Sequence, residues 1–116
     1  MRAEVKGFIW PDLDQDLSVP PGEQRTLLQF IAGPLGEAGE EAFQVMVCTV
    51  EGLSELVARD GIVVGRHYLF VESINVRRVE EFVRDRLRRI DGDTWADLAD
   101  KIGRIGLWEF EDYTAG

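Results

Sequence analysis

The chain is poor in the residues on which most catalytic and metal sites depend. Its 116 residues include one cysteine, Cys48, and one histidine, His67. A single cysteine excludes a disulfide within the chain and fits a reducing compartment. One histidine and one cysteine do not make a transition-metal ligand set. No Gly-x-Ser-x-Gly motif and no phosphate-binding loop occurs. The sequence therefore predicts no catalytic residue, no cofactor and no metal.

Positive charge and long apolar runs are also scarce. The chain has 13 Lys and Arg against 22 Asp and Glu, a formal net charge of −9. This balance disfavours nucleic acid and anionic membranes as partners. It favours a protein with a basic surface, because a negative field speeds encounter with a positive one, although solubility alone would explain it equally well. No run approaches the ~20 apolar residues of a membrane span. Residues 1–6 hold no signal-peptide core, so we expect a cytoplasmic protein.

What the sequence does contain is the hydrophobic pattern of a single α+β domain over residues 1–116. The length suits one domain, and 45% hydrophobic residues support a core without cross-links. Alternation and helical periodicity predict a series of elements: strands over 2–10, 25–32, 41–49 and 67–71, helices over 50–58, 75–90 and from Thr94 to Ile102, and an extended segment over 107–113. We expect a small antiparallel β-sheet, whose first three strands form a meander, with about three α-helices packed on one face.

The same periodicities assign side chains to faces. In the first strand, Ala3, Val5, Gly7 and Ile9 are predicted to point one way. Leu53, Leu56 and Val57 give the first helix an apolar stripe, and Thr49 can cap it. In the helix over 75–90 we expect one apolar face, widened by Phe82 and formed by Val76, Val79, Val83, Leu87 and Ile90. On the opposite face we expect charge pairs at spacings of three and four residues, which join Glu80 and Glu81 to Arg84, and Asp85 to Arg89.

The acidic residues are the remaining candidates for function. Asp12, Asp14 and Asp16 alternate, but they lack the glycine and the distal glutamate of an EF-hand loop. A pair of carboxylates for glycoside hydrolysis stays open on sequence alone, although a domain of this size has little room for a sugar cleft. Loop carboxylates beside an aromatic anchor suit a protein interface. The predicted partner-binding residues are Trp10, Asp12, Asp14, Asp16, Glu37, Glu40, Glu41, Glu109, Glu111 and Asp112.

Three stretches of the chain resemble a known family. They are Gly61-Ile-Val-Val-Gly-Arg-His-Tyr-Leu69, Gly92-Asp-Thr-Trp95 and Gly106-Leu-Trp-Glu-Phe-Glu-Asp-Tyr113. Their order is similar to that of the immunity protein 8 family of bacterial polymorphic toxin systems. The strand that leads into Pro11-Asp12 and the strand end Val47-Cys48-Thr49 fit as well. Members of the family carry Thr-Pro where this chain has Thr49-Val50, and valine can take the first helical position.

The resemblance implies a cytoplasmic protein that binds and neutralises the toxin encoded beside it. With the net charge, it predicts a non-enzymatic inhibitor of a toxin with a basic surface, of which a nuclease domain is one example. Two alternatives remain at this point. One is a small acidic adaptor or regulatory domain that binds another protein. The other is a small carboxylate-based hydrolase, which requires a cleft with at least one carboxylate of raised pKa.

Overall fold

The computed structural model describes residues 1–109, which form five strands and three helices. Phe110 to Tyr113 of the predicted last segment, including Glu111 and Asp112, lie outside the described residues. In chain order the elements are β1 (Ala3–Ile9), β2 (Arg25–Pro34), β3 (Glu41–Thr49), α1 (Val50–Asp60), β4 (Tyr68–Val71), α2 (Val76–Arg88), α3 (Trp95–Ile102) and β5 (Leu107–Trp108). The α+β class is confirmed.

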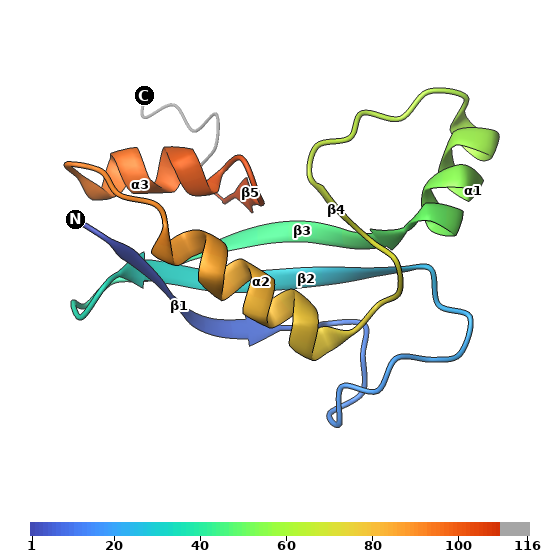
Figure 1. The fold of residues 1–116 in the computed structure, drawn as a ribbon, viewed down its shortest axis with the longest axis horizontal. Coiled ribbons are helices and arrows are strands. Elements are labelled where there is room, and N and C mark those ends of the chain that lie inside the picture. The colour runs from blue at the N-terminus through green and yellow to red at the C-terminus, as the bar shows by residue number, and fades with distance from the viewer. Residues whose placement is uncertain (110–116) are drawn as a thin grey trace.

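The strands form one sheet in the order β1-β2-β3-β4, and β5 pairs with β3 on the same side as β4 (Figure 1). The first three strands make the predicted antiparallel meander. β4 instead runs parallel to β3, from Met46 opposite Tyr68 to Thr49 opposite Val71. A parallel neighbour requires a crossover connection, which here consists of α1 and the loop that follows it. The sheet is therefore antiparallel except at β4.

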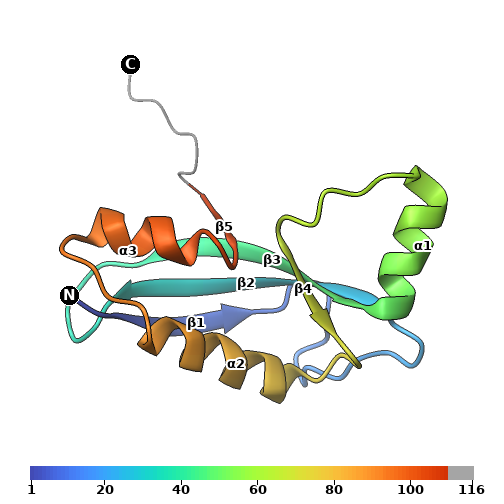
Figure 2. The same cartoon turned by 45° about the horizontal axis from the view of Figure 1, so that its top comes forward.

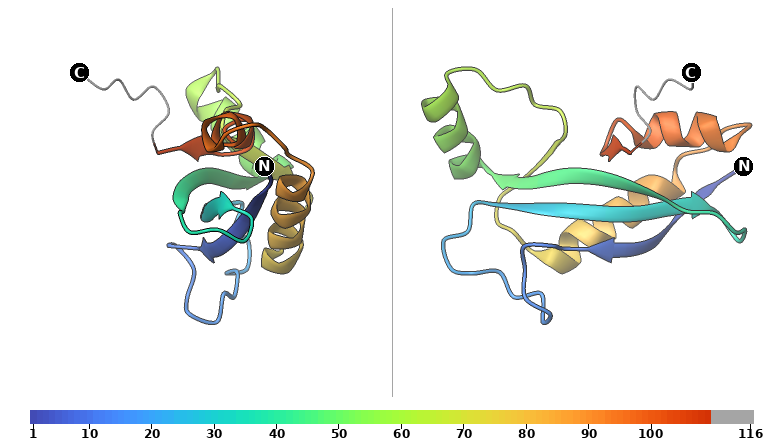
Figure 3. Two further views of the ribbon diagram at one scale, coloured as in Figure 1. Left: turned by 90° about the vertical axis from the view of Figure 1, so that its left-hand side faces the viewer. Right: turned by 180° about the vertical axis from the view of Figure 1, so that it is seen from behind.

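The core lies between one face of the sheet and two of the helices. Leu28 and Phe30 of β2 and Phe43, Val45 and Val47 of β3 alternate along their strands and are almost fully buried. The Phe30 and Phe43 rings stack with centroids 5.3 Å apart. Figure 2 and the end-on view in Figure 3 show α2 lying along this face. The helices add a second set of buried side chains: Val79, Val83 and Leu87 from α2, and Leu98, Ala99 and Ile102 from α3.

A β-bulge in β1 changes which of its residues enter the core. Val5 pairs with Ala32 but Gly7 pairs with Ile31, so one residue, Lys6, is left without a partner position. An extra residue reverses the alternation beyond it. Phe8 and Trp10 therefore pack against the core, whereas Ile9, predicted to share a face with Ala3 and Val5, is 47% exposed.

Helix α1 begins and ends as its sequence predicts but packs less than its stripe suggests. The Thr49 hydroxyl accepts a hydrogen bond from the Gly52 N–H at 3.1 Å, and Gly61, with φ of 77°, ends the helix. Only Gly52 and Leu56 are buried, and Val57 is 42% exposed. Figures 1 and 3 show the reason: α1 projects beyond the end of the sheet, while α2 and α3 cover the core.

Helices α2 and α3 are held at their N-termini by capping side chains. Asn75 accepts from the Arg78 N–H, and Thr94 accepts from the Asp97 N–H. The predicted stripe of α2 is confirmed at its centre, but Phe82 is 41% exposed and lies under the guanidinium of Arg86. The charge pairs have helical spacing but join different residues from those predicted, namely Arg77 with Glu81 and Asp85 with Arg88.

Candidate partner-binding surface

The fold separates the predicted acidic surface into two. Asp12, Asp14 and Asp16 follow β1, whereas Glu37 and Glu40 lie in the turn between β2 and β3. Figure 1 shows these connections at opposite ends of the sheet, in a molecule whose longest extent is 41 Å. Successive turns of a meander must lie at opposite ends, so the predicted strand order already contained this separation. The carboxylates form two candidate surfaces.

The first candidate surface is the acidic loop, residues 11–18. The carboxylates of Asp12, Asp14 and Asp16 are exposed, and none of them takes part in the ion pairs found in residues 1–109. Asp16 accepts hydrogen bonds from the backbone N–H of Ser18 at 3.0 Å and from its hydroxyl at 2.8 Å. These bonds lower the pKa of Asp16 below the ordinary aspartate value. The loop therefore presents uncompensated negative charge.

Trp10 supports this loop from within the core. Its side chain is only 5% exposed, and its indole Nε1 donates a hydrogen bond to Oε2 of Glu80 on α2 at 2.9 Å. The backbone N–H of Leu13 donates to the Trp10 carbonyl, and the Leu13 side chain packs against the core. A ring that is buried to this extent offers a partner almost no surface. Trp10, predicted as a partner-binding residue, therefore lies behind the acidic loop and not on its surface, because the bulge in β1 turns the ring inward.

The second candidate surface, at the other end of the sheet, consists of Glu37, Glu40, Glu41 and Glu109. Two of its carboxylates also make internal bonds. Glu41 accepts a hydrogen bond from the indole of Trp108 at 2.5 Å, and Glu109 accepts one from the Ala42 N–H at 3.1 Å. Both bonds join β5 to the start of β3. Glu37 and Glu40 are exposed, so this surface serves the fold as well as presenting charge.

The α1 end of the sheet adds exposed apolar side chains to its acidic loop. We define the α1 end as the acidic loop, α1 and residues 61–65. The Thr49 N–H donates to the Gln24 carbonyl at 2.9 Å, which joins the end of the loop connection to the start of α1. The large apolar side chains exposed here are Leu17 at 38%, Val50 at 65%, Val57 at 42%, Ile62 at 87% and Val64 at 75%. Sequence reasoning missed Ile62 and Val64, although the glycines on both sides of their run weaken the pattern of a strand.

Three other groups that could take part in chemistry, His67, Cys48 and Asp60, make contacts within the fold. His67 immediately precedes β4, and its Nε2 lies 2.7 Å from the Gly103 carbonyl oxygen. Burial raises the pKa of the Cys48 thiol, which is fully buried beneath α1. The pKa of Asp60 is lowered by its hydrogen bonds to Arg59. Within residues 1–109, no three His, Cys, Asp or Glu side chains are placed to hold a metal. None of the helices in that range is long and apolar enough to cross a membrane.

Comparison with known proteins gives one result. No curated protein and no solved structure matches the chain. A family model does match, and it covers nearly the whole sequence, including all five strands and all three helices except the first residue of β1. Residues 4–113 match the model of Immunity protein 8, and the chain therefore belongs to this family.

Proposed function

We propose that this immunity-family protein binds a cognate toxin of a bacterial polymorphic toxin system and neutralises it by protein–protein contact. The α1 end is the proposed contact surface, and the toxin surface it meets is basic. A toxin nuclease domain has such a surface, because a protein that contacts phosphates needs clustered Lys and Arg. Family membership supports the immunity role. The protein acts in the cytoplasm, where it meets the toxin before export.

The observation that carries the choice of surface is the combination found at the α1 end. The acidic loop carries three aspartates without an ion pair and the exposed Leu17, and α1 and residues 61–65, at the same end of the sheet, carry further exposed apolar side chains, including Ile62 and Val64. Protein interfaces combine an apolar centre with a polar rim, and rim charges steer the partner to the site. The second candidate surface has exposed Glu37 and Glu40, and the large exposed apolar side chains near it are Leu35 in that turn and Leu107 of β5, fewer than the five at the α1 end. An ordinary interface buries about 800 Å² on each partner, so one end suffices.

A binding role agrees with the electrostatics better than hydrolysis does. A carboxylate that acts as a general acid near neutral pH needs a raised pKa. The pKa values of Asp16 and Asp60 are instead shifted downward by hydrogen bonds. Lowered pKa values keep carboxylates ionised, which suits a surface that attracts a basic partner.

Coexpression with the toxin encoded beside this gene tests the proposal. We expect the chain to rescue cells from the toxin and to form a stoichiometric complex that survives gel filtration. If the toxin still kills cells that contain the folded protein, and the two proteins elute separately, the immunity proposal is wrong. An adaptor that serves another pathway would give this second result.

Matched charge variants test the choice of surface. Replacing Asp12, Asp14 and Asp16 with Asn removes three charges from the α1 end, and replacing Glu37 and Glu40 with Gln removes two from the opposite end. We expect the first set to slow association by on the order of tenfold at low salt and the second to have little effect. Stopped-flow association rates at two salt concentrations measure this. The opposite ranking would move the interface to the second candidate surface.

A further inference from the structure

The outer edge of β4 is an unpaired strand edge. Within residues 1–109, β4 pairs only with β3, on one of its two sides. The Met46 N–H donates to the His67 carbonyl at 3.0 Å, which sets the alternation of a parallel ladder. The backbone groups of Leu69 and Val71 consequently point toward β3, and those of Phe70 point outward. An exposed edge of this kind is a template for one more strand.

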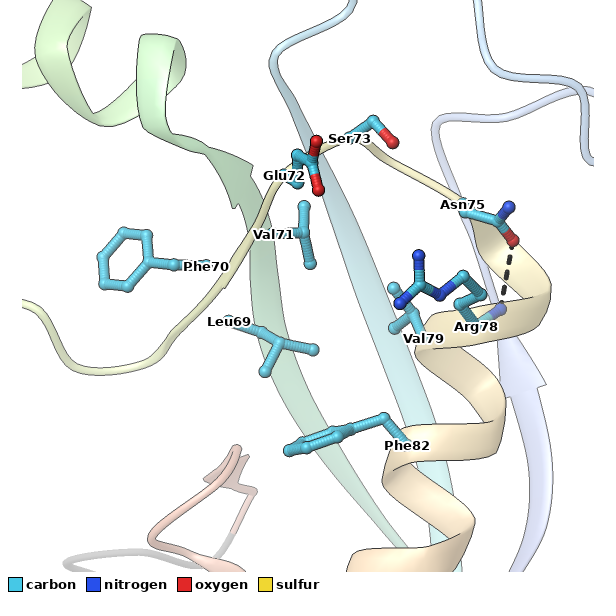
Figure 4. Close-up of a pocket in the computed structure, with 9 residues that line it drawn as sticks. All are labelled: Leu69, Phe70, Val71, Glu72, Ser73, Asn75, Arg78, Val79 and Phe82. Atoms are coloured by element: carbon cyan, nitrogen blue, oxygen red, sulfur yellow. Dashed lines mark hydrogen bonds between the residues drawn. The ribbon is translucent and has the colours of Figure 1, made fainter.

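A cavity of about 320 Å³ lies between this edge and α2 (Figure 4). Part of its wall is apolar: Leu69 and Val71 point toward α2, and Val79 and Phe82 point back toward β4. Phe82 is the exposed residue at which α2 departs from its predicted buried stripe. The sheet edge and the helix thus leave uncovered apolar surface between them, in the place where a neighbouring strand would direct its side chains.

Two opposite charges line the same cavity. Arg78 extends from α2 into it, and Glu72 lies at its upper end beyond β4 in Figure 4. Among residues 1–109, no ion pair joins them and neither side chain has another charged partner. By contrast, Arg77 and Arg88 on the same helix are paired with carboxylates. Arg78 is therefore available to a carboxylate from outside.

We propose that the outer edge of β4 accepts an extended segment of the toxin as an added strand. The backbone of the segment pairs with Phe70, and one of its apolar side chains enters the cavity between β4 and α2. A carboxylate of the segment pairs with Arg78. This inference rests on the proposed function for the identity of the partner. β4 pairs with the end of β3 from which α1 begins, so the added strand would extend the proposed interface from the α1 end.

Strand geometry explains how backbone, apolar and charged contacts can be made together. Alternate side chains of a strand lie on one face, spaced by roughly 7 Å. In an added strand, one such residue would face Val79 and Phe82. The next residue on that face would lie within reach of Arg78. Main-chain hydrogen bonds give such complexes affinity, and side-chain pockets give them specificity. The combination selects an extended segment over a helix, which has no free backbone groups to offer.

Residue-resolved amide exchange tests strand addition directly. The isotope-labelled protein is measured alone and in complex with the neighbouring gene's toxin domain. We expect the Phe70 amide to exchange rapidly in the free protein and at least tenfold more slowly in the complex, while the amides of Leu69 and Val71, already bonded to β3, change little. A Phe70 amide that stays unprotected in a stable complex overturns the proposal. Protection that appears without toxin and rises with protein concentration also overturns it, because the occupant is then a second copy.

Two variants test the same contact by affinity. Phe70→Pro removes the outward N–H without touching a bond to β3, and Arg78→Glu reverses the charge in the cavity. We expect each to weaken toxin binding by about tenfold or more, since tenfold corresponds to one or two hydrogen bonds. Arg77→Glu, one residue away on α2 and outside the cavity, is the matched control and should bind as the unmodified protein does. Circular dichroism and urea unfolding establish that each variant folds.

The outcomes separate this inference from the proposed function. If the unmodified protein neither binds nor neutralises the toxin, the proposed function fails first. If it does both, and Arg78→Glu and Phe70→Pro bind as tightly as Arg77→Glu, the immunity role stands and the β4 inference fails. Because Arg78→Glu lies on an exposed part of α2, it keeps the test decisive even if the proline variant does not fold.

Discussion

The two ends of the sheet are built in opposite ways. At the end that carries α3, the chain is joined by many contacts: Gly92 donates to the Met1 carbonyl at 3.1 Å, Arg2 donates to the Arg88 carbonyl at 2.9 Å, and Leu98 and Ile102 are fully buried. At the α1 end, Leu56 is the one large side chain that α1 buries, and it lies outside the main core cluster. Regions with few buried contacts open most easily and often bind ligands. The difference identifies the α3 end as scaffold and the α1 end as available surface.

The largest expected effect on the free energy of unfolding comes from truncating one buried side chain at each end of the sheet. Ile102→Ala should lower the free energy of unfolding by about 2–5 kcal/mol, because the neighbours of a fully buried side chain cannot close the cavity. Leu56→Ala should cost less, because α1 is attached outside that core. Urea denaturation of both variants measures the difference. Equal losses would show that α1 belongs to the main cooperative unit.

Labelling of Cys48 sharpens the comparison. The thiol is fully buried next to Gly52 of α1, and its pKa is raised, so a thiol reagent can reach it only when α1 opens. We expect Leu56→Ala to speed labelling by about tenfold, since this variant weakens the docking of α1. Ile102→Ala should leave the rate nearly unchanged, and the chain's single cysteine makes the signal unambiguous. A similar acceleration in both variants would mean that α1 opens only with global unfolding.

The hydrogen bond from Trp10 to Glu80 fixes the base of the acidic loop to the scaffold. Trp10→Phe keeps an aromatic ring but removes the donor, and should lower the free energy of unfolding by about 1–2 kcal/mol. Glu80→Gln keeps an acceptor oxygen and should cost less. Urea unfolding measures both, and toxin affinity measured alongside reports whether the loop must be held in place to bind. An unchanged stability in Trp10→Phe would contradict the proposed attachment.

The smallest expected effect is local to Asp16. Because Ser18 lowers the pKa of this carboxyl, folding stabilises its ionised form. That contribution is present above the unfolded-state pKa, about 4, and is lost as the pH falls through the lower folded-state value. We expect Ser18→Ala to move the pKa upward toward the ordinary aspartate value, as measured by NMR titration of the side-chain carboxyl carbon. A titration midpoint that Ser18→Ala leaves in place would refute this cause.

Hydrophobic periodicity predicted the elements but not all of their surroundings. The three strands of the meander and all three helices follow directly from alternating and helical patterns, because those patterns record which side of an element is buried. The bulge at Lys6 is not visible in the alternation of β1, so the pattern predicts Ile9 on the face of Ala3 and Val5 and gives no sign that Trp10 points into the core. The apolar stripe of α1 correctly indicates a helix. It does not reveal whether that helix packs on the core or at the end of one strand.

The candidate site depended on long-range arrangement, which single residues do not encode. Asp12 and Glu37 belong to one acidic group in composition but to opposite ends in the fold. The cavity beside β4 needed the parallel pairing of β4 with β3, and short apolar runs do not distinguish parallel from antiparallel partners. Arg78 looked like one of six arginines on a solvated helix face. Only the fold shows that it lines a cavity and that no carboxylate of residues 1–109 pairs with it.

Helix α1 makes a close backbone contact with the end of the connection between β1 and β2, and this contact bears on how the protein can evolve. A Cβ atom added to Gly52 would lie 2.7 Å from the Gln24 carbonyl oxygen, so close contact holds the helix at a residue without a side chain. Glycine costs a helix about 1 kcal/mol relative to alanine, and the close approach explains its presence. The outward residues of α1 can therefore be exchanged without disturbing the core. If α1 belongs to the contact surface, as proposed, a lineage that faces a changing toxin can alter these outward residues while the sheet beneath stays the same.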